Sequence, residues 1–132
     1  MKEIYLYLLT VPVFFGIDML WILLVARKFY TDNIGSLMKP MPNWPAAIIF
    51  YLIYIAGIIY LVVLPNADKG VTRVLVAGAV FGLIAYATYD LTNYSTLKNW
   101  PLNVTIVDMI WGGVITGVVS VISFYIYNLL WK

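Results

Sequence analysis

Long apolar stretches alternate with short polar links along this chain, and the alternation predicts its architecture. Four stretches rich in aliphatic and aromatic residues are separated by segments that hold most of the charges and prolines. Their approximate limits are residues 4–26, 46–64, 71–94 and 104–131. An apolar run of about 20 residues can cross the hydrocarbon core of a membrane as one helix. The pattern therefore predicts four transmembrane helices in a single domain, residues 1–132.

Short links between the four stretches also predict the topology. Consecutive helices must run in opposite directions, so we expect an all-α, antiparallel up-down four-helix bundle with both termini on one side of the membrane. The composition agrees with this class, because 64% of the residues are hydrophobic and only 11% are charged. Four of the eight Lys and Arg residues fall on each side, so the positive-inside rule chooses no orientation.

Glycines at four-residue spacing occur in the last two predicted helices. Gly78 and Gly82 form one pair, and Gly113 and Gly117 form the other. Small residues at this spacing let helix backbones approach closely inside a membrane, where lipid offers no hydrophobic drive for association. We therefore expect the third and fourth helices to pack tightly as a hairpin.

The tripeptide Asn-Trp-Pro occurs twice, at residues 43–45 and 99–101, each time before a predicted helix on the same side of the membrane. Asn can cap a helix, Trp favours the membrane interface, and Pro is tolerated in a first helical turn. The repeat fits either a duplicated helical hairpin or two independent helix starts. We interpret all five tryptophans as interface and packing residues rather than as a ligand cage: Trp21, Trp44, Trp100, Trp111 and Trp131.

The chain contains neither cysteine nor histidine. Disulfides, thiolate nucleophiles and imidazole bases are therefore excluded, and so are the usual ligands of zinc, haem and copper. The net charge of +2 gives no reason to expect a nucleic-acid partner. We expect no metal and no cofactor, so any chemistry must come from carboxylates, amides, hydroxyls, Lys and Arg.

Three of the six acidic residues, Asp18, Asp90 and Asp108, lie within or at the ends of predicted helices. A charged side chain costs about 2.5–3.5 kcal/mol at the centre of a membrane span, so its presence there indicates a function. The antiparallel topology places all three in the half of the bundle that carries both Asn-Trp-Pro copies. The alternative is structural: the acids then stabilise helix ends or reach lipid headgroups.

Helical spacing groups the polar residues of the third helix. Tyr86, Asp90 and Asn93 follow one another at four- and three-residue steps, with Tyr89 adjacent, so they form one polar stripe. We expect this stripe to face the fourth helix and Asp18 across a polar pocket. The candidate ligand-binding residues are Asp18, Tyr86, Tyr89, Asp90, Asn93, Lys98 and Asp108. No catalytic residue is assigned, and the sequence does not decide whether the protein is an enzyme.

Three runs of sequence carry a resemblance to a known family: FFGIDMLWILLVARKFY, PNWPAAIIFYLIYIAGIIYLVVLP and AYATYDLTNYSTLKNWPLNVTIVDMIWGGVITGVVS. The chain resembles a family of small predicted bacterial membrane proteins that is defined only as a domain of unknown function. The resemblance covers nearly the whole chain, and YDLTNYSTLKNWP is its most specific part. It implies a four-span protein of the bacterial inner membrane, and it implies no activity. The residues that resemble the family's motifs are Asp18, Trp21, Tyr89, Asp90, Asn93, Lys98, Trp100, Pro101 and Asp108.

Three classes of function follow from these observations. We favour a protein that binds a lipid or small amphiphile in the carboxylate pocket near one membrane face. A proton- or cation-coupled transporter or channel is the first alternative, and it requires a homo-oligomer because four helices enclose little aqueous space. A non-catalytic accessory or assembly subunit is the second alternative, with the polar hairpin as its docking surface. Membrane lipids are the partners expected in every case.

Overall fold

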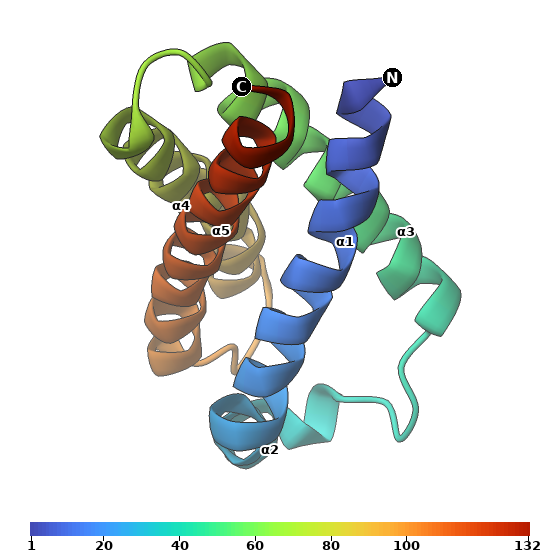
Figure 1. Cartoon of the computed structure of the whole chain (residues 1–132). Helices are drawn as coiled ribbons and strands as arrows, with labels where there is room; N and C mark the ends of the chain where they lie inside the picture. Colours follow the sequence, from blue (N-terminus) through green and yellow to red (C-terminus); the bar gives the residue numbers. More distant parts are fainter.

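The computed structural model describes all residues from Met1 to Lys132 and contains helices but no strands. Its four long helical segments are apolar enough to cross a membrane. They run antiparallel, and both termini lie at the same end of the bundle (Figure 1). The expected fold class is therefore confirmed. The main helices are α1 (Lys2–Trp21), α3 (Trp44–Gly57), α4 (Val71–Thr96) and α5 (Leu102–Trp131).

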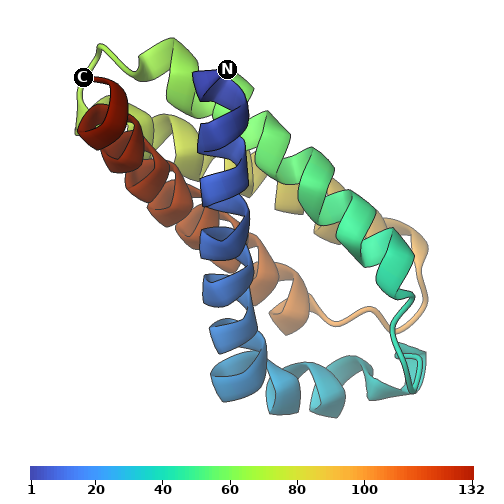
Figure 2. The same cartoon turned by 45° about the vertical axis from the view of Figure 1, so that its right-hand side comes forward.

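A change of direction follows α1. The segment Ile22–Ala26 forms a turn of π-helix, which leads into the short helix α2 (Arg27–Ile34). Helix α2 lies across the end of the bundle opposite the termini, as Figure 2 shows. The short 3₁₀ helix Gly35–Leu37 and an extended link then bring the chain to α3. A second π-helical turn, Ile58–Val63, extends α3 toward the link before α4.

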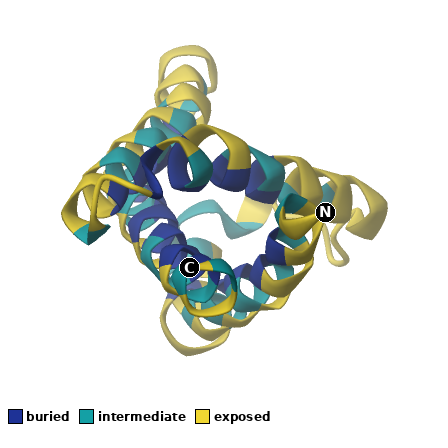
Figure 3. Cartoon of the chain, turned by 45° about the horizontal axis from the view of Figure 1, so that its top comes forward, coloured by how far each residue is buried: buried dark blue, intermediate teal, exposed yellow.

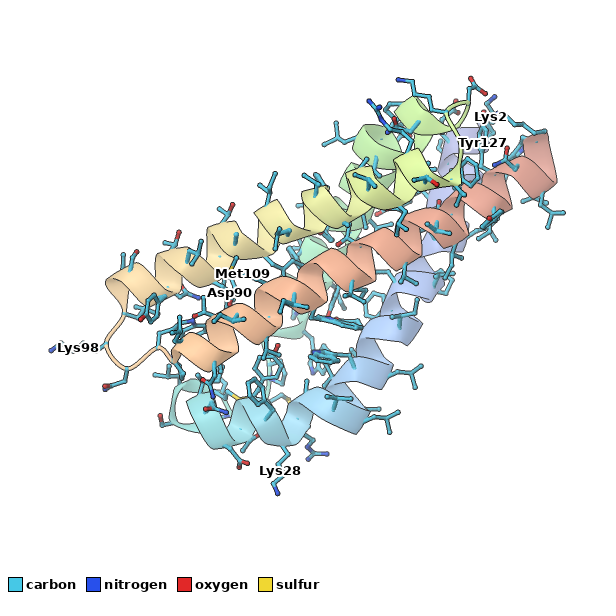
Figure 4. The ribbon with its side chains drawn as sticks, turned by 90° about the vertical axis from the view of Figure 1, so that its left-hand side faces the viewer. Lys2, Lys28, Asp90, Lys98, Met109 and Tyr127 are labelled. Carbon is cyan, nitrogen blue, oxygen red and sulfur yellow. The ribbon has the colours of Figure 1, made fainter.

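Helices α4 and α5 pack closely along their length (Figure 4). A β-carbon added to Gly82 would lie 2.1 Å from the carbonyl oxygen of Gly112, so only glycine fits this crossing. A β-carbon at Gly113 or Gly117 would have its nearest neighbours at 3.4 Å and 3.2 Å. The predicted tight hairpin is confirmed, but Gly112 makes the closest approach on α5 rather than the predicted glycine pair.

The apolar core occupies the middle of the bundle and the end that carries the termini. Leu6, Val63, Val74 and Val119 are wholly buried there, one from each wall of the bundle. Figure 3 shows the buried residues on the inner faces of the helices and the exposed residues on the outer faces. The outer faces are largely apolar, as expected of helices that contact lipid.

Polar contacts stabilise the end of the bundle that carries the termini. The ammonium group of Lys132 forms an ion pair with Asp68 and donates a hydrogen bond of 3.0 Å to the carbonyl oxygen of Ala67. The same ammonium group holds the pKa of the Asp68 carboxyl below its ordinary value. The ammonium group of Lys2 lies 5.3 Å from the ring centroid of Tyr127, a cation–π contact that Figure 4 shows at this end.

The opposite end of the bundle is more open, because α3 diverges from α1 there (Figures 1 and 2). Almost every residue in the first two turns of α3 is exposed, and the helix joins the buried core only from Tyr54 onward. The start of α3 is nevertheless well formed. The side chain of Asn43 accepts a hydrogen bond of 3.2 Å from the backbone N–H of Ala46, which confirms the predicted cap.

Candidate functional site

The open end of the bundle contains a cavity of about 400 Å³. Its wall combines residues from the end of α1, from α2 and the link after it, from the end of α4 and from the start of α5. The wall is mostly apolar, and its aromatic and ionisable side chains are Trp21, Arg27, Tyr30, Tyr89, Asp90, Trp100, Asp108 and Trp111. This cavity is the candidate functional site.

Asp90 is the most unusual residue of the cavity wall. Its exposed fraction is 0%, and no N–H or hydroxyl group donates a hydrogen bond to either carboxyl oxygen, but the carboxyl group of Asp108 lies within hydrogen-bonding reach of it. Figure 4 places it between α4 and α5, and the acidic group that interacts with it is Asp108 on α5. Burying a carboxyl group next to a second acid and without a basic partner is costly, so native proteins seldom keep such a pair without a functional reason.

Asp108 connects the cavity wall to α2. The hydroxyl of Tyr30 donates a hydrogen bond of 2.6 Å to Asp108 Oδ1. A second bond of 2.8 Å runs from Asn103 Nδ2 on α5 to Asn33 Oδ1 on α2. These two bonds hold α2 against the start of α5, and α2 thereby contributes one wall of the cavity.

Asp18 does not line the cavity, although the sequence suggested that it would face the ligand. It accepts a hydrogen bond from the hydroxyl of Tyr51 and another, of 3.2 Å, from the indole N–H of Trp111. The ring of Trp111 in turn stacks on Trp21, with ring centroids 4.3 Å apart and an interplanar angle of 8°. Asp18 therefore positions one aromatic wall of the cavity.

The two Asn-Trp-Pro copies have different structural roles. Trp44 is 48% exposed, as expected of an interface residue, whereas Trp100 is 8% exposed and lines the cavity. Asn99 adopts a left-handed backbone conformation, with φ of 62°, in the turn that leads to Trp100. The indole N–H of Trp100 is buried without an acceptor. The interpretation of all five tryptophans as interface and packing residues was therefore incomplete, since Trp21, Trp100 and Trp111 form cavity walls.

A second cavity, of about 290 Å³, adjoins the first. We call the first the large cavity and the second the small cavity. The two cavities share Tyr89 and Asp108, and the remaining lining of the second is Phe50, Ala85 and Tyr86. Its wall is mostly apolar and comes from α3, α4 and α5. Phe50 belongs to the divergent start of α3 and is 50% exposed, so this cavity lies next to the lipid-facing surface.

The structure brings together four of the seven predicted site residues. Tyr86, Tyr89, Asp90 and Asp108 line one or both cavities. Asn93 is half-buried and lines neither cavity. Lys98 lies in the exposed hairpin between α4 and α5 and points away from the bundle (Figure 4).

The sequence analysis did not identify Tyr30 as a site residue, because it treated the segment after residue 26 as a link. Ala26, Tyr30 and Ile34 all line the large cavity and recur every four residues, which is the apolar spacing of a helix. That spacing was the available signal for α2.

No basic side chain pairs with the acids at this end. The two ion pairs of the chain join the N-terminal amine to Glu3 and Lys132 to Asp68, both at the terminal end. Arg27 lines the large cavity, but it is exposed and forms no ion pair. The three helix-borne aspartates do not gather into a group that could hold a metal ion. The site therefore offers carboxyl oxygens without a basic partner, one free indole N–H and one free guanidinium group.

Comparison with known proteins gives a family. No curated protein and no solved structure matches the chain. A family model described as predicted membrane protein (DUF2177) matches residues 3–125, which include every residue named in the two cavities. The match confirms the family resemblance seen in the sequence, and with four helices able to cross a membrane the chain is a multi-pass membrane protein. The chain belongs to this family of predicted membrane proteins.

Proposed function

We propose that this protein binds a lipid or another membrane amphiphile, with the polar head in the large cavity and the apolar chain in the small one. The observation that supports this most strongly is the pair of acids Asp90 and Asp108 on the wall of a cavity: Asp90 is wholly buried, no N–H or hydroxyl group donates to it, and neither acid has a basic partner. Ionisable residues inside membrane proteins usually mark binding sites or pathways. The volume of the large cavity, about 400 Å³, lies in the range of small-molecule sites.

The arrangement of the two cavities matches the two parts of an amphiphile. Both cavities have mostly apolar walls and share Asp108; the large cavity adds Asp90 and Arg27, whereas the small cavity adds no further charged residue and adjoins the exposed Phe50. Because the cavities share Tyr89 and Asp108, a head and the start of its chain can occupy both at once. The small cavity lies beside Phe50, which is half exposed on the outer face of α3, so an apolar chain in this cavity would lie next to the lipid-facing surface.

Native mass spectrometry of protein extracted in a mild detergent tests this proposal. We expect the wild type to retain a bound amphiphile and Ala85→Phe to lose it, because the larger side chain fills the small cavity. Ala46→Phe is the matched control, since Ala46 is exposed at the start of α3 and lines neither cavity. The proposal fails if the wild type carries no amphiphile, or if folded Ala85→Phe retains as much as the control.

A further inference from the structure

The ionisable groups of the large cavity are not balanced in charge. Asp90 and Asp108 are its two acids, and Arg27 is its one basic residue. Neither acid has a basic nitrogen within ion-pair distance. Asp108 accepts a hydrogen bond from the hydroxyl of Tyr30, whereas no N–H or hydroxyl group donates to Asp90, whose polar neighbour is the carboxyl group of Asp108. A ligand that donates hydrogen bonds and brings positive charge would satisfy Asp90.

The aromatic walls favour the same ligand chemistry. The stacked rings of Trp21 and Trp111 form one wall, and the ring of Trp100 belongs to the same cavity. Indole faces attract ammonium groups through their π electrons, and this attraction is larger where water is excluded. Carboxylates combined with aromatic faces are the usual recognition chemistry of a protonated amine.

Two hydrogen-bond donors of the cavity lack an acceptor. The indole N–H of Trp100 is buried without an acceptor, and this observation is independent of the acids. Arg27 is exposed, lines the cavity and has no carboxylate partner for its guanidinium group. The fork of N–H donors on arginine fits a phosphate group well. These donors indicate an anionic acceptor next to the amine.

We propose that the ligand has a zwitterionic head group, with a protonated amine against Asp90 and Asp108 and a phosphate against Arg27 and Trp100. This inference rests on the proposed function, because it assigns the chemistry of the head in the same cavity. An ethanolamine phospholipid has these two charges in one head group, separated by two carbon atoms. The inference therefore selects zwitterionic aminophospholipids among the lipids of a membrane.

Lipid competition with the unmodified protein tests the inference. Detergent-purified, delipidated protein is offered phosphatidylethanolamine, its N-acetylated form, phosphatidylglycerol or a long-chain alkylamine, all with matched chains, and retention is measured by native mass spectrometry. We expect phosphatidylethanolamine to be retained at least about tenfold better than each of the others, the effect of one charge-assisted hydrogen bond. Equal retention of the N-acetylated lipid or of phosphatidylglycerol would overturn the amine assignment, and equal retention of the alkylamine would overturn the phosphate assignment.

Two variants separate the two charges. Asp90→Asn should remove the preference for phosphatidylethanolamine over its N-acetylated form, and Arg27→Gln should reduce retention of the phospholipid but not of the alkylamine. Asp68→Asn removes an acid at the terminal end and should leave every preference unchanged. A preference that persists in Asp90→Asn contradicts the inference. Retention of all four lipids without discrimination leaves amphiphile binding intact, whereas retention of none of them contradicts the proposed function itself.

Discussion

The two ends of this bundle differ in how many of their polar groups are paired. At the terminal end, Thr10 and Ser123 form a hydrogen bond of 3.0 Å between α1 and α5, and Lys132 pairs with Asp68. At the α2 end, around a cavity, no N–H or hydroxyl group donates to the buried Asp90, and the buried indole N–H of Trp100 has no acceptor. The difference indicates that close packing near the middle and at the terminal end holds the helices together, so the α2 end can keep polar groups unpaired, and we propose that these groups meet a ligand.

The largest expected effect comes from the close packing of α4 and α5. In Gly82→Ala the new β-carbon would lie 2.1 Å from the carbonyl oxygen of Gly112 and 2.5 Å from Thr116 Oγ1. The helices must separate, and overpacking of this kind costs about 1–3 kcal/mol or more. Thermal unfolding in detergent should show a large fall in stability. The control Gly113→Ala has its nearest neighbour at 3.4 Å and should change stability little, so equal losses in both variants would contradict this account.

The next largest effect is an increase in stability, expected from a substitution of Asp90 at the α2 end. In ligand-free protein, Asp90→Leu should raise the free energy of unfolding by about 1–2 kcal/mol, because it removes a buried carboxyl group that faces a second acid and has no basic partner. The same variant should lose the retained amphiphile in native mass spectrometry. A gain in stability with a loss of binding would distinguish a functional carboxyl from a structural one. Lower stability in ligand-free Asp90→Leu would show instead that the carboxyl group supports the fold.

A smaller effect is expected from the paired polar groups at the terminal end. Thr10→Val keeps the side-chain shape but leaves Ser123 without its partner, and interhelical hydrogen bonds in membranes contribute about 0.6 kcal/mol on average. The free energy of unfolding should therefore fall by about this amount. A double-mutant cycle with Ser123→Ala measures the pair directly, and an interaction energy of zero would remove the contrast between the two ends.

The smallest effect concerns the exposed pair of Lys132 and Asp68. Because Lys132 lowers the pKa of Asp68 in the folded protein, the pair contributes stability above the ordinary aspartate pKa of 3.8. This contribution is lost as the pH falls below 3.8 and through the folded-state pKa. The difference in melting temperature between wild type and Asp68→Asn should be slight at neutral pH and vanish in acid. A difference that grows on acidification would have the wrong sign for this pair.

The fold could be predicted from the sequence because it depends on features that are local in the chain. Four apolar runs of membrane-spanning length fix the number of helices, and short links fix their antiparallel order. The shared face of Tyr86 and Asp90 also followed from helical spacing alone. The tight hairpin was predictable from its glycines, although the helix rotation that selects Gly112 depends on the packed side chains.

The candidate site was harder to predict because its walls depend on contacts between distant segments. The π-helical turn at Ile22–Ala26 shifts the helical phase, so the sequence pattern did not reveal that Tyr30 reaches Asp108. The role of Asp18 depends on Tyr51 and Trp111, which lie 33 and 93 residues away in the chain. Spacing within one helix contains no information about such partners.

The stacked indoles of Trp21 and Trp111 give the cavity an optical signal of its own. Two parallel rings 4.3 Å apart couple their electronic transitions, and both rings belong to the wall that a bound head group would touch. Occupancy should therefore change the near-ultraviolet circular dichroism and the tryptophan emission of unlabelled protein. Candidate lipids can then be ranked by affinity from spectroscopic titrations, without mass spectrometry.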